Sequence, residues 1–200
     1  FVGSTGPGGG GVFSRSQLNI DLSGTEAWTI SFDIAVTFTG TLPTANNIGR
    51  FSTRSFAGGG DASGIIMLAT WANFDTADTW NADMVWFNEA GTSITENVPD
   101  TGFQGLMAER WYRWTLKVDS FANRVLEVSI RDLESGAESV YNPTDRYMSG
   151  GAGGGHVPEG YRLFAGNTDI AGNTMCFDNV SITEIPAIGG CCLLDGTCLP

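Results

Sequence analysis

Basic side chains are scarce in this chain of 200 residues. It has 10 lysines and arginines against 22 acidic residues, a formal net charge of -12, and Lys117 is its only lysine. Such a chain repels a phosphate backbone, which excludes nucleic acid as a partner. No apolar run approaches the roughly 20 residues that cross a bilayer. No basic segment followed by an apolar one opens the chain, so we expect no membrane insertion.

Histidine is nearly absent, and this limits the enzyme chemistry that the sequence allows. His156 is the only one, and it lies in the glycine-rich stretch SGGAGGGH. A serine or cysteine hydrolase with the usual imidazole base would have to use this residue. No set of histidines and cysteines suits zinc. The sequence therefore predicts a protein without catalytic activity.

Alternating apolar residues are the strongest positive signal. In AWTISFDIAVTF, residues 27 to 38, Trp28, Phe32 and Phe38 belong to a period-two pattern that predicts one buried face of a long strand. WYRWTLKV (111 to 118) and VLEVSI (125 to 130) alternate in the same way around the turn DSFANR and predict a hairpin. A short strand is expected near Val140, and weaker strands at 13–22, 48–56, 64–71, 84–88, 161–165 and 174–183.

The predicted strands and glycine-rich breaks indicate one domain with two short ends. We expect a glycine-rich segment at 1–12, a β-sandwich at 13–186 and a cysteine-rich tail at 187–200. No stretch has the period of an amphipathic helix. The fold class is therefore all-β, an antiparallel two-sheet jelly-roll sandwich.

Three segments carry a resemblance to a known superfamily: WTISFDIAV, the WYRW and VLEVSI pair, and the last strand FDNVSITEIP. The chain resembles the concanavalin A-like lectin and glucanase superfamily, and within it the LamG-like jelly-roll domains of secreted bacterial proteins. The tail CCLLDGTCLP is similar to short segments of planctomycete-type extracellular proteins. The resemblance implies a two-sheet jelly roll. Glycan-cleaving members carry E-x-D-x-E on one strand; this chain lacks that triplet.

The resemblance also implies a structural calcium ion at Asp178 and Asn179, in FDNV. Calcium takes oxygen ligands, which aspartate and asparagine supply. Asp75, Asp78 and Asp83 in the expected acidic loop NFDTADTWNAD, and the loop around Asp169, are further candidates, although none has the EF-hand spacing. Ordinary solvated turns are the alternative for each of these.

Aromatic and acidic residues together suggest a glycan site. β-Sandwiches bind sugars with exposed rings beside polar side chains. Trp71, Trp80 and Trp111 are the candidate rings, because Trp80 lies in an acidic stretch and Trp111 on the polar face of its strand. Asp78 and Asp83 would supply the hydrogen bonds. The alternative is that these rings pack under loops.

Cysteines are few, and three of the four lie in the tail: Cys191, Cys192 and Cys198, with Cys176 before them. An even number near a glycine-bounded tail predicts disulfides and an extracellular or cell-surface location. A bridge between neighbouring Cys191 and Cys192 is strained, so Cys176 is expected to pair with one of them and the other with Cys198. A bridge to a second copy is the alternative.

These features together predict a structural protein. We expect a non-catalytic subunit of an extracellular filament, sheath or adhesive layer, with copies of itself as partners in a homopolymer. A lectin-like carbohydrate-binding module is the alternative, with a glycan as partner, and a glycoside hydrolase is third.

Overall fold

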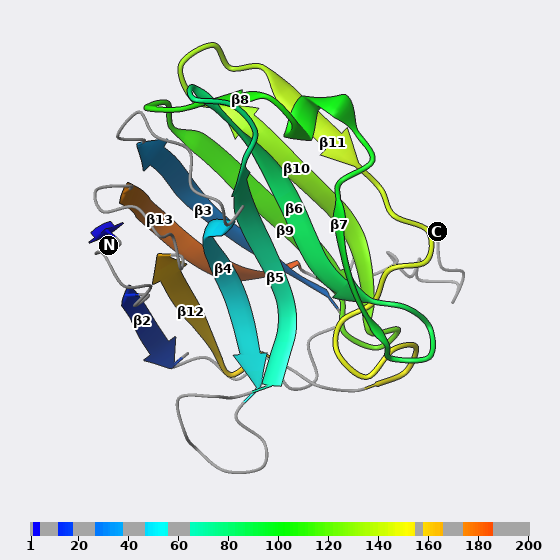
Figure 1. Ribbon diagram of the computed structural model, residues 1–200. Helices are drawn as coiled ribbons and strands as arrows, with labels where there is room; N and C mark the ends of the chain where they lie inside the picture. Colours follow the sequence, from blue (N-terminus) through cyan, green and yellow to red (C-terminus); the bar gives the residue numbers. More distant parts are fainter. Residues whose placement is uncertain are drawn as a thin grey trace, which may run out of the picture.

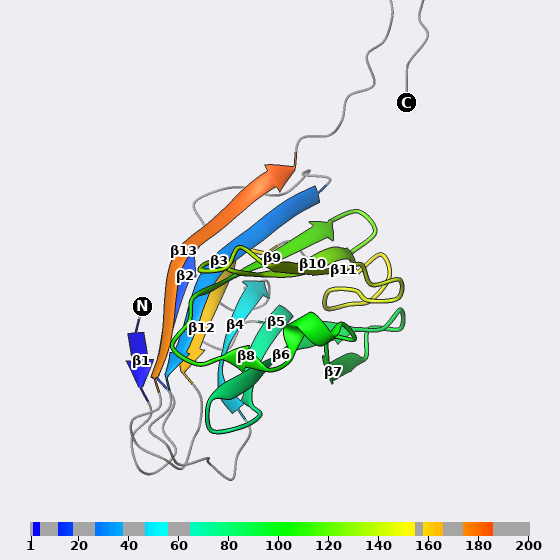
Figure 2. The ribbon, with the colours of Figure 1, turned by 90° about the horizontal axis from the view of Figure 1, so that it is seen from above.

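The computed structural model describes residues 2–4, 12–17, 27–37, 47–55, 65–154, 158–165 and 174–185. These residues form two antiparallel sheets that lie face to face, as the view from above shows (Figure 2). In that part of the chain the only helix is the 3₁₀ turn η1 (Thr101–Phe103). No helix there is long and apolar enough to cross a membrane.

The first sheet has six strands. Their spatial order is β1 (Val2–Ser4), β13 (Thr174–Ile185), β3 (Ala27–Thr37), β9 (Tyr112–Asp119), β10 (Arg124–Asp132) and β11 (Glu138–Tyr141). The predicted hairpin is β9 and β10, so this prediction is confirmed. We expected residues 1–12 to be a glycine-rich segment outside the sandwich. They contribute β1, which pairs with β13.

The second sheet has seven strands. Their spatial order is β2 (Val12–Gln17), β12 (Gly160–Ala165), β4 (Asn47–Ser55), β5 (Ile65–Phe74), β6 (Thr79–Phe87) and β7 (Ser93–Asn97), with β8 (Leu106–Met107) paired to β6 (Figure 1). All pairs are antiparallel, and neighbours in space are often distant in sequence. This confirms the predicted all-β jelly-roll sandwich.

Apolar side chains fill the space between the sheets. Trp28, Phe32 and Trp114 are fully buried, as the alternation predicts for their strands. Phe32 of β3 stacks on Phe51 of β4 with 4.2 Å between ring centroids, which joins the two sheets at their centre. Because the core takes every second side chain, the side chains between them form two outer faces, and these carry the polar groups.

Candidate functional site

Three arginines lie together on the outer face of the seven-stranded sheet. Phe51 points into the core, so its neighbours Arg50 and Ser52 project from the opposite face, and Arg54 follows by the same alternation. In the register of β12 with β4, Arg162 lies directly opposite Ser52. We call Arg50, Arg54 and Arg162 the arginine cluster.

Two guanidinium groups of the cluster share one aromatic ring. The Cζ of Arg50 lies 5.0 Å from the centroid of the Phe164 ring, and that of Arg162 lies 5.6 Å from it. Both are cation–π distances. Arg54 lies beside them, where its Nε donates a hydrogen bond of 3.1 Å to the Ser52 hydroxyl.

Burial and mutual repulsion act on the cluster together. Arg54 is 4% exposed, and its burial, followed by the charges of Arg162 and Arg50, lowers its pKa to about 10. Burial and the charge of Arg162 also lower the pKa of Arg50. Both lowered pKa values mean that the folded protein disfavours the charged form of these arginines. An anion placed against the cluster would relieve this repulsion.

Asp83 projects from the same outer face, on β6. It is 8% exposed, and one carboxylate oxygen accepts a hydrogen bond from the side-chain amide of Asn73. Among the described residues its other oxygen, Oδ1, has no hydrogen-bond partner. Burial raises the pKa of Asp83, and the bond from Asn73 offsets part of that rise. A buried carboxyl with a free acceptor is characteristic of functional sites.

The pairing register of β4, β5 and β6 gives the distance between Asp83 and the arginine cluster. Trp71 of β5 is the register partner of both Arg50 on β4 and Asp83 on β6. Asp83 and Arg50 are therefore two strands apart, about 10 Å between backbones. On the other side Asp83 pairs with Asn97 of β7, whose side chain is exposed. The outer face of the seven-stranded sheet therefore carries cations at the arginine cluster and hydrogen-bond acceptors two strands away, at Asp83.

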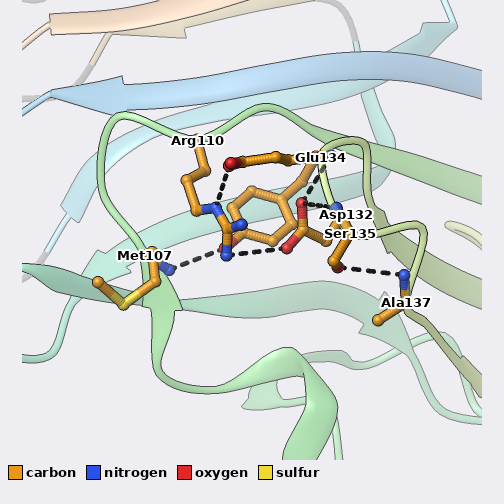
Figure 3. Close-up of polar contacts among 7 residues, drawn as sticks. Met107, Arg110, Asp132, Glu134, Ser135 and Ala137 are labelled. Atoms are coloured by element: carbon orange, nitrogen blue, oxygen red, sulfur yellow. Dashed lines mark hydrogen bonds and ion pairs between the residues drawn. The ribbon is translucent and has the colours of Figure 1, made fainter.

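A second polar cluster lies at the end of the six-stranded sheet. Arg110 contacts Asp132 at 3.1 Å and Glu134 at 2.8 Å, beside Tyr112, whose hydroxyl accepts a hydrogen bond from the Met107 backbone (Figure 3). A pocket of about 250 Å³ lined partly by Tyr112 and Asp132 opens here. Arg110 is thus paired with two carboxylates at the edge of this pocket.

Asp178 and Asn179, the predicted calcium ligands, lie at a bulge in β13 on the outer face of the six-stranded sheet. The side-chain amide of Asn179 donates a 2.6 Å hydrogen bond to Asp33, which Arg113 also contacts at 2.8 and 2.9 Å. Burial alone would raise the pKa of Asp33, but these bonds and the charge of Arg113 lower it.

Calcium needs six to eight oxygen ligands, and Asp178 with Asn179 supplies only part of such a set. No group of three or more acidic, histidine or cysteine side chains gathers as a metal site in the described ranges. Asp75 accepts a hydrogen bond from Thr79 within a tight turn, and Asp78 is exposed in the same turn. Calcium at Asp178 and Asn179 stays a prediction, and Asp169 lies outside the described residues.

The structure does not bring the predicted glycan residues together. Trp80 is fully buried in β6, where it meets Tyr112 edge to face at 5.7 Å, so its ring is not available for stacking. Trp111 is 40% exposed but lies on the other sheet, before β9. Asp78 is in a turn and Asp83 is within a strand, not in the loop that we expected. Asp83 belongs to the face of the arginine cluster, and Trp71, the third predicted ring, is its register partner on β5.

The arginine cluster was not predicted from the sequence, although one signal for it is present. GRFSTRS places Arg50, Ser52 and Arg54 at alternate positions of a predicted strand. The whole chain has only 10 basic residues, so two arginines on the same face of one strand are a concentration of positive charge. Arg162 and Asn73 carry no such signal, because only the strand register brings them to this face.

Several predicted residues lie outside the described part of the chain. These are His156 and the tail cysteines Cys191, Cys192 and Cys198. Cys176, the one cysteine among the described residues, is half-buried in β13 and forms no disulfide there. The disulfide pairing therefore stays a prediction.

Comparison with known proteins identifies relatives of the fold only. No family model matches the chain, and no curated protein matches its sequence. An alginate lyase from Aplysia kurodai matches in structure with a TM-score of 0.54 and 13% identity, over 85% of this chain and 74% of that enzyme. A scytalido-glutamic peptidase matches with a TM-score of 0.50 and 12% identity, over 88% of this chain and 79% of the peptidase.

An alginate lyase from Pseudomonas aeruginosa also matches, with a TM-score of 0.46 and 10% identity, over 80% of this chain. The chain spans 65% of the length of that enzyme. The two matches with a TM-score of 0.50 or more support the jelly-roll sandwich fold, which is the coarser part of the predicted resemblance. At such low identity the likeness fixes the fold and assigns no role to a residue.

The comparison overturns the predicted function. We expected a non-catalytic structural subunit and no enzyme, because histidine is nearly absent and the E-x-D-x-E triplet is missing. An alginate lyase and a glutamic peptidase share this sandwich, and both are enzymes. The absence of an imidazole base and of one glycosidase motif was too narrow a reason, because the same architecture carries other chemistries. The prediction of a filament, sheath or adhesive layer is wrong.

Proposed function

We propose that this protein binds an acidic carbohydrate, a chain of uronic acid units, on the outer face of its seven-stranded sheet. The observation that carries the proposal is the arginine cluster. Arg50, Arg54 and Arg162 are held on one face of a strongly acidic chain, where burial and mutual charge lower the pKa of Arg54 to about 10. Guanidinium groups bind carboxylates in planar, charge-assisted pairs.

A carbohydrate fits this face better than other anions do. The Phe164 ring beside Arg50 and Arg162 adds apolar surface, which suits the apolar side of a sugar. The net charge of -12 disfavours a nucleic acid, whose duplex carries about one charge per 1.7 Å. The alginate lyase from Aplysia kurodai supports the proposal, since a protein of this architecture acts on a polyuronate.

Calorimetric titration with two matched sugars tests the proposal. The first is an alginate hexasaccharide, and the second is the same hexasaccharide with its carboxyl groups reduced to alcohols. We expect the acidic sugar to bind at least about tenfold more tightly, with an affinity that falls as salt is added. Equal affinities, or no binding of the acidic sugar, would refute the proposal.

Cleavage of the bound glycan is the second candidate function, and Asp83 is the observation that favours it. A buried carboxyl whose pKa is raised by its burial is a candidate for proton transfer. Mass spectrometry of the hexasaccharide after incubation measures cleavage. Shorter products with the wild type and none with Asp83→Asn are expected. An unchanged length with the wild type would remove this candidate and leave the binding proposal intact.

An extracellular location and the finer resemblance to LamG-like domains are proposals that accompany a glycan ligand. The cysteine content supports the location. Mass mapping of the cystine peptides of native protein tests it: Cys176 joined to a tail cysteine is expected, and four free thiols would contradict an oxidising compartment.

A further inference from the structure

A pocket of about 250 Å³ lies at one end of the sandwich, and the proposed function does not use it. It opens between the segment from η1 to β8 and the turn that joins β10 to β11. Its lining joins apolar side chains of the core to polar residues, among them Leu106, Ile130, Tyr112, Asp132 and Ser139. Ligand pockets combine apolar surface with a few hydrogen-bonding groups in this way.

Two glycines shape one wall of the pocket. A Cβ atom on Gly102 would lie 1.7 Å from the Ser139 hydroxyl oxygen, so the backbone of η1 packs directly against this side chain. Gly105 has a φ of 63°, in the left-handed region that glycine adopts without strain. A Cβ atom on Gly105 would have no neighbour within 4 Å. The lining at Gly105 is therefore backbone beside open space.

Ser139 supplies a hydroxyl group that has no hydrogen-bond partner in the described part of the chain. In the register of β11 with β10, Ser139 lies opposite Ile130, which is 2% exposed, so its side chain points toward the interior and the pocket. The side chain of Ser139 is half-buried, so a small molecule reaches it. A hydroxyl group both donates and accepts hydrogen bonds, and a ligand in the pocket can bind it in either direction.

The charges beside the pocket favour a neutral ligand. The side chain of Asp132 is 12% exposed and contacts Arg110 at 3.1 Å, and Arg110 also contacts Glu134 at 2.8 Å (Figure 3). One cation and two carboxylates leave a single negative charge, which repels an anion. A cationic ligand at Asp132 would lie against the guanidinium group of Arg110, which repels it as well. A neutral ligand meets neither repulsion.

We propose that this pocket binds one ring of a neutral sugar. Hydroxyl groups of the ring pair with the Ser139 hydroxyl and with Oδ2 of Asp132, which retains an acceptor position beside its contact with Arg110. The apolar lining suits the C–H side of the ring. Pockets for drug-sized ligands measure roughly 300–1,000 Å³, so about 250 Å³ suits a molecule of one ring. No residue of the arginine cluster lines the pocket, so the inference is independent of the proposed function.

NMR titration of ¹⁵N-labelled protein with matched sugars tests the proposal. The probes are glucose, galactose and mannose, each beside its uronic acid and its amino sugar. We expect at least one neutral hexose to shift the amide signals of Gly105 and Ser139 with a saturable, millimolar dissociation constant. It should bind at least about threefold more tightly than either charged counterpart. No saturable shift with any of the three hexoses, or equal or tighter binding of a charged counterpart, would overturn the proposal.

Two variants, each with a matched control, locate the sugar. Ser139→Ala should weaken hexose binding about threefold or more, because one hydrogen bond is lost, while Ser93→Ala, at an exposed serine of β7, should bind like the wild type. In Asp132→Asn the preference over the uronic acid should disappear, because the local charges then balance. Asp145→Asn, at an exposed aspartate, should keep that preference. Unchanged binding by Ser139→Ala, or an unchanged preference in Asp132→Asn, contradicts the proposal.

The outcomes separate this proposal from the proposed function. If a neutral hexose binds at Gly105 and Ser139 and the alginate hexasaccharide does not bind, the proposed function fails and the pocket stands. If the hexasaccharide binds and no neutral hexose does, the pocket fails and the proposed function stands. Thermal melting of Ser139→Ala and Asp132→Asn checks that each variant is folded.

Discussion

The two sheets carry their outward-facing cations in opposite ways. On the six-stranded sheet Arg113 meets Asp33 at 2.8 Å, and Lys117 meets Glu127 at 2.7 Å. The bond to Asp33 raises the pKa of Arg113. On the seven-stranded sheet burial and neighbouring arginines lower the pKa of Arg50 and Arg54. On the first face carboxylates neutralise the cations, and on the second face burial and neighbouring like charges act on the arginines.

The largest effect is expected from breaking the pair on the six-stranded sheet. Arg113→Met leaves the buried carboxylate of Asp33 with the Asn179 amide as its remaining donor. We expect a loss of about 3 kcal/mol in the free energy of unfolding, which lowers the melting temperature by roughly 6 to 12 °C. Urea unfolding at pH 7 measures it.

Arg131→Met is the control for that change, because Arg131 is exposed on the same sheet. A variant Arg113→Met as stable as Arg131→Met would contradict a structural role for the pair. Because the pKa of Asp33 is lowered, its stabilisation is present above pH 3.8 and is lost as the pH falls through the lowered pKa.

The next effect concerns ligand affinity and not stability. Arg50→Gln and Arg162→Gln each remove one half-buried cation beside Phe164. Each should weaken binding of the alginate hexasaccharide by at least about tenfold, or about 1.4 kcal/mol. Arg131→Gln removes the same charge from the other sheet, so an equal loss there would show that net charge alone governs binding.

The smallest effect is expected at Arg110, because its partner Glu134 is exposed and its other partner, Asp132, keeps a hydrogen bond from the Glu134 backbone. Ion pairs with an exposed partner contribute little in water. Arg110→Gln should leave both the melting temperature and the hexasaccharide affinity unchanged. A tenfold loss of affinity would move the binding site to the pocket lined partly by Tyr112 and Asp132, at the end of the other sheet.

The sequence predicted those strands whose two faces differ clearly. β3 was expected at residues 27 to 38 and spans Ala27–Thr37, because large apolar residues alternate along its whole length. β7 (Ser93–Asn97) was missed because only Ile94 in it is large and apolar. The start of β6 was taken for a loop, since Asp and Asn residues conceal the inward alternation of Trp80, Ala82 and Met84.

The candidate site was less accessible to sequence reasoning than the fold. The sequence identified Asp83 as a candidate site residue. It did not identify the residues beside Asp83, because they lie on other strands, β5 and β7. Arg50 and Arg162 are 112 residues apart, and only the pairing of β4 with β12 brings them together. Strand order across a sandwich is a long-range property that the period-two pattern of a single strand does not contain.

Side-chain NMR of the arginines tests the central claim most directly. With the alginate hexasaccharide added, the Nε–Hε signals of Arg50, Arg54 and Arg162 should shift, and their shifts should saturate at one common dissociation constant. Those of Arg110, Arg113 and Arg146, each bound to a carboxylate of the protein, should stay in place. Shifts confined to the second set would contradict the account, because the ligand would then lie away from the arginine cluster.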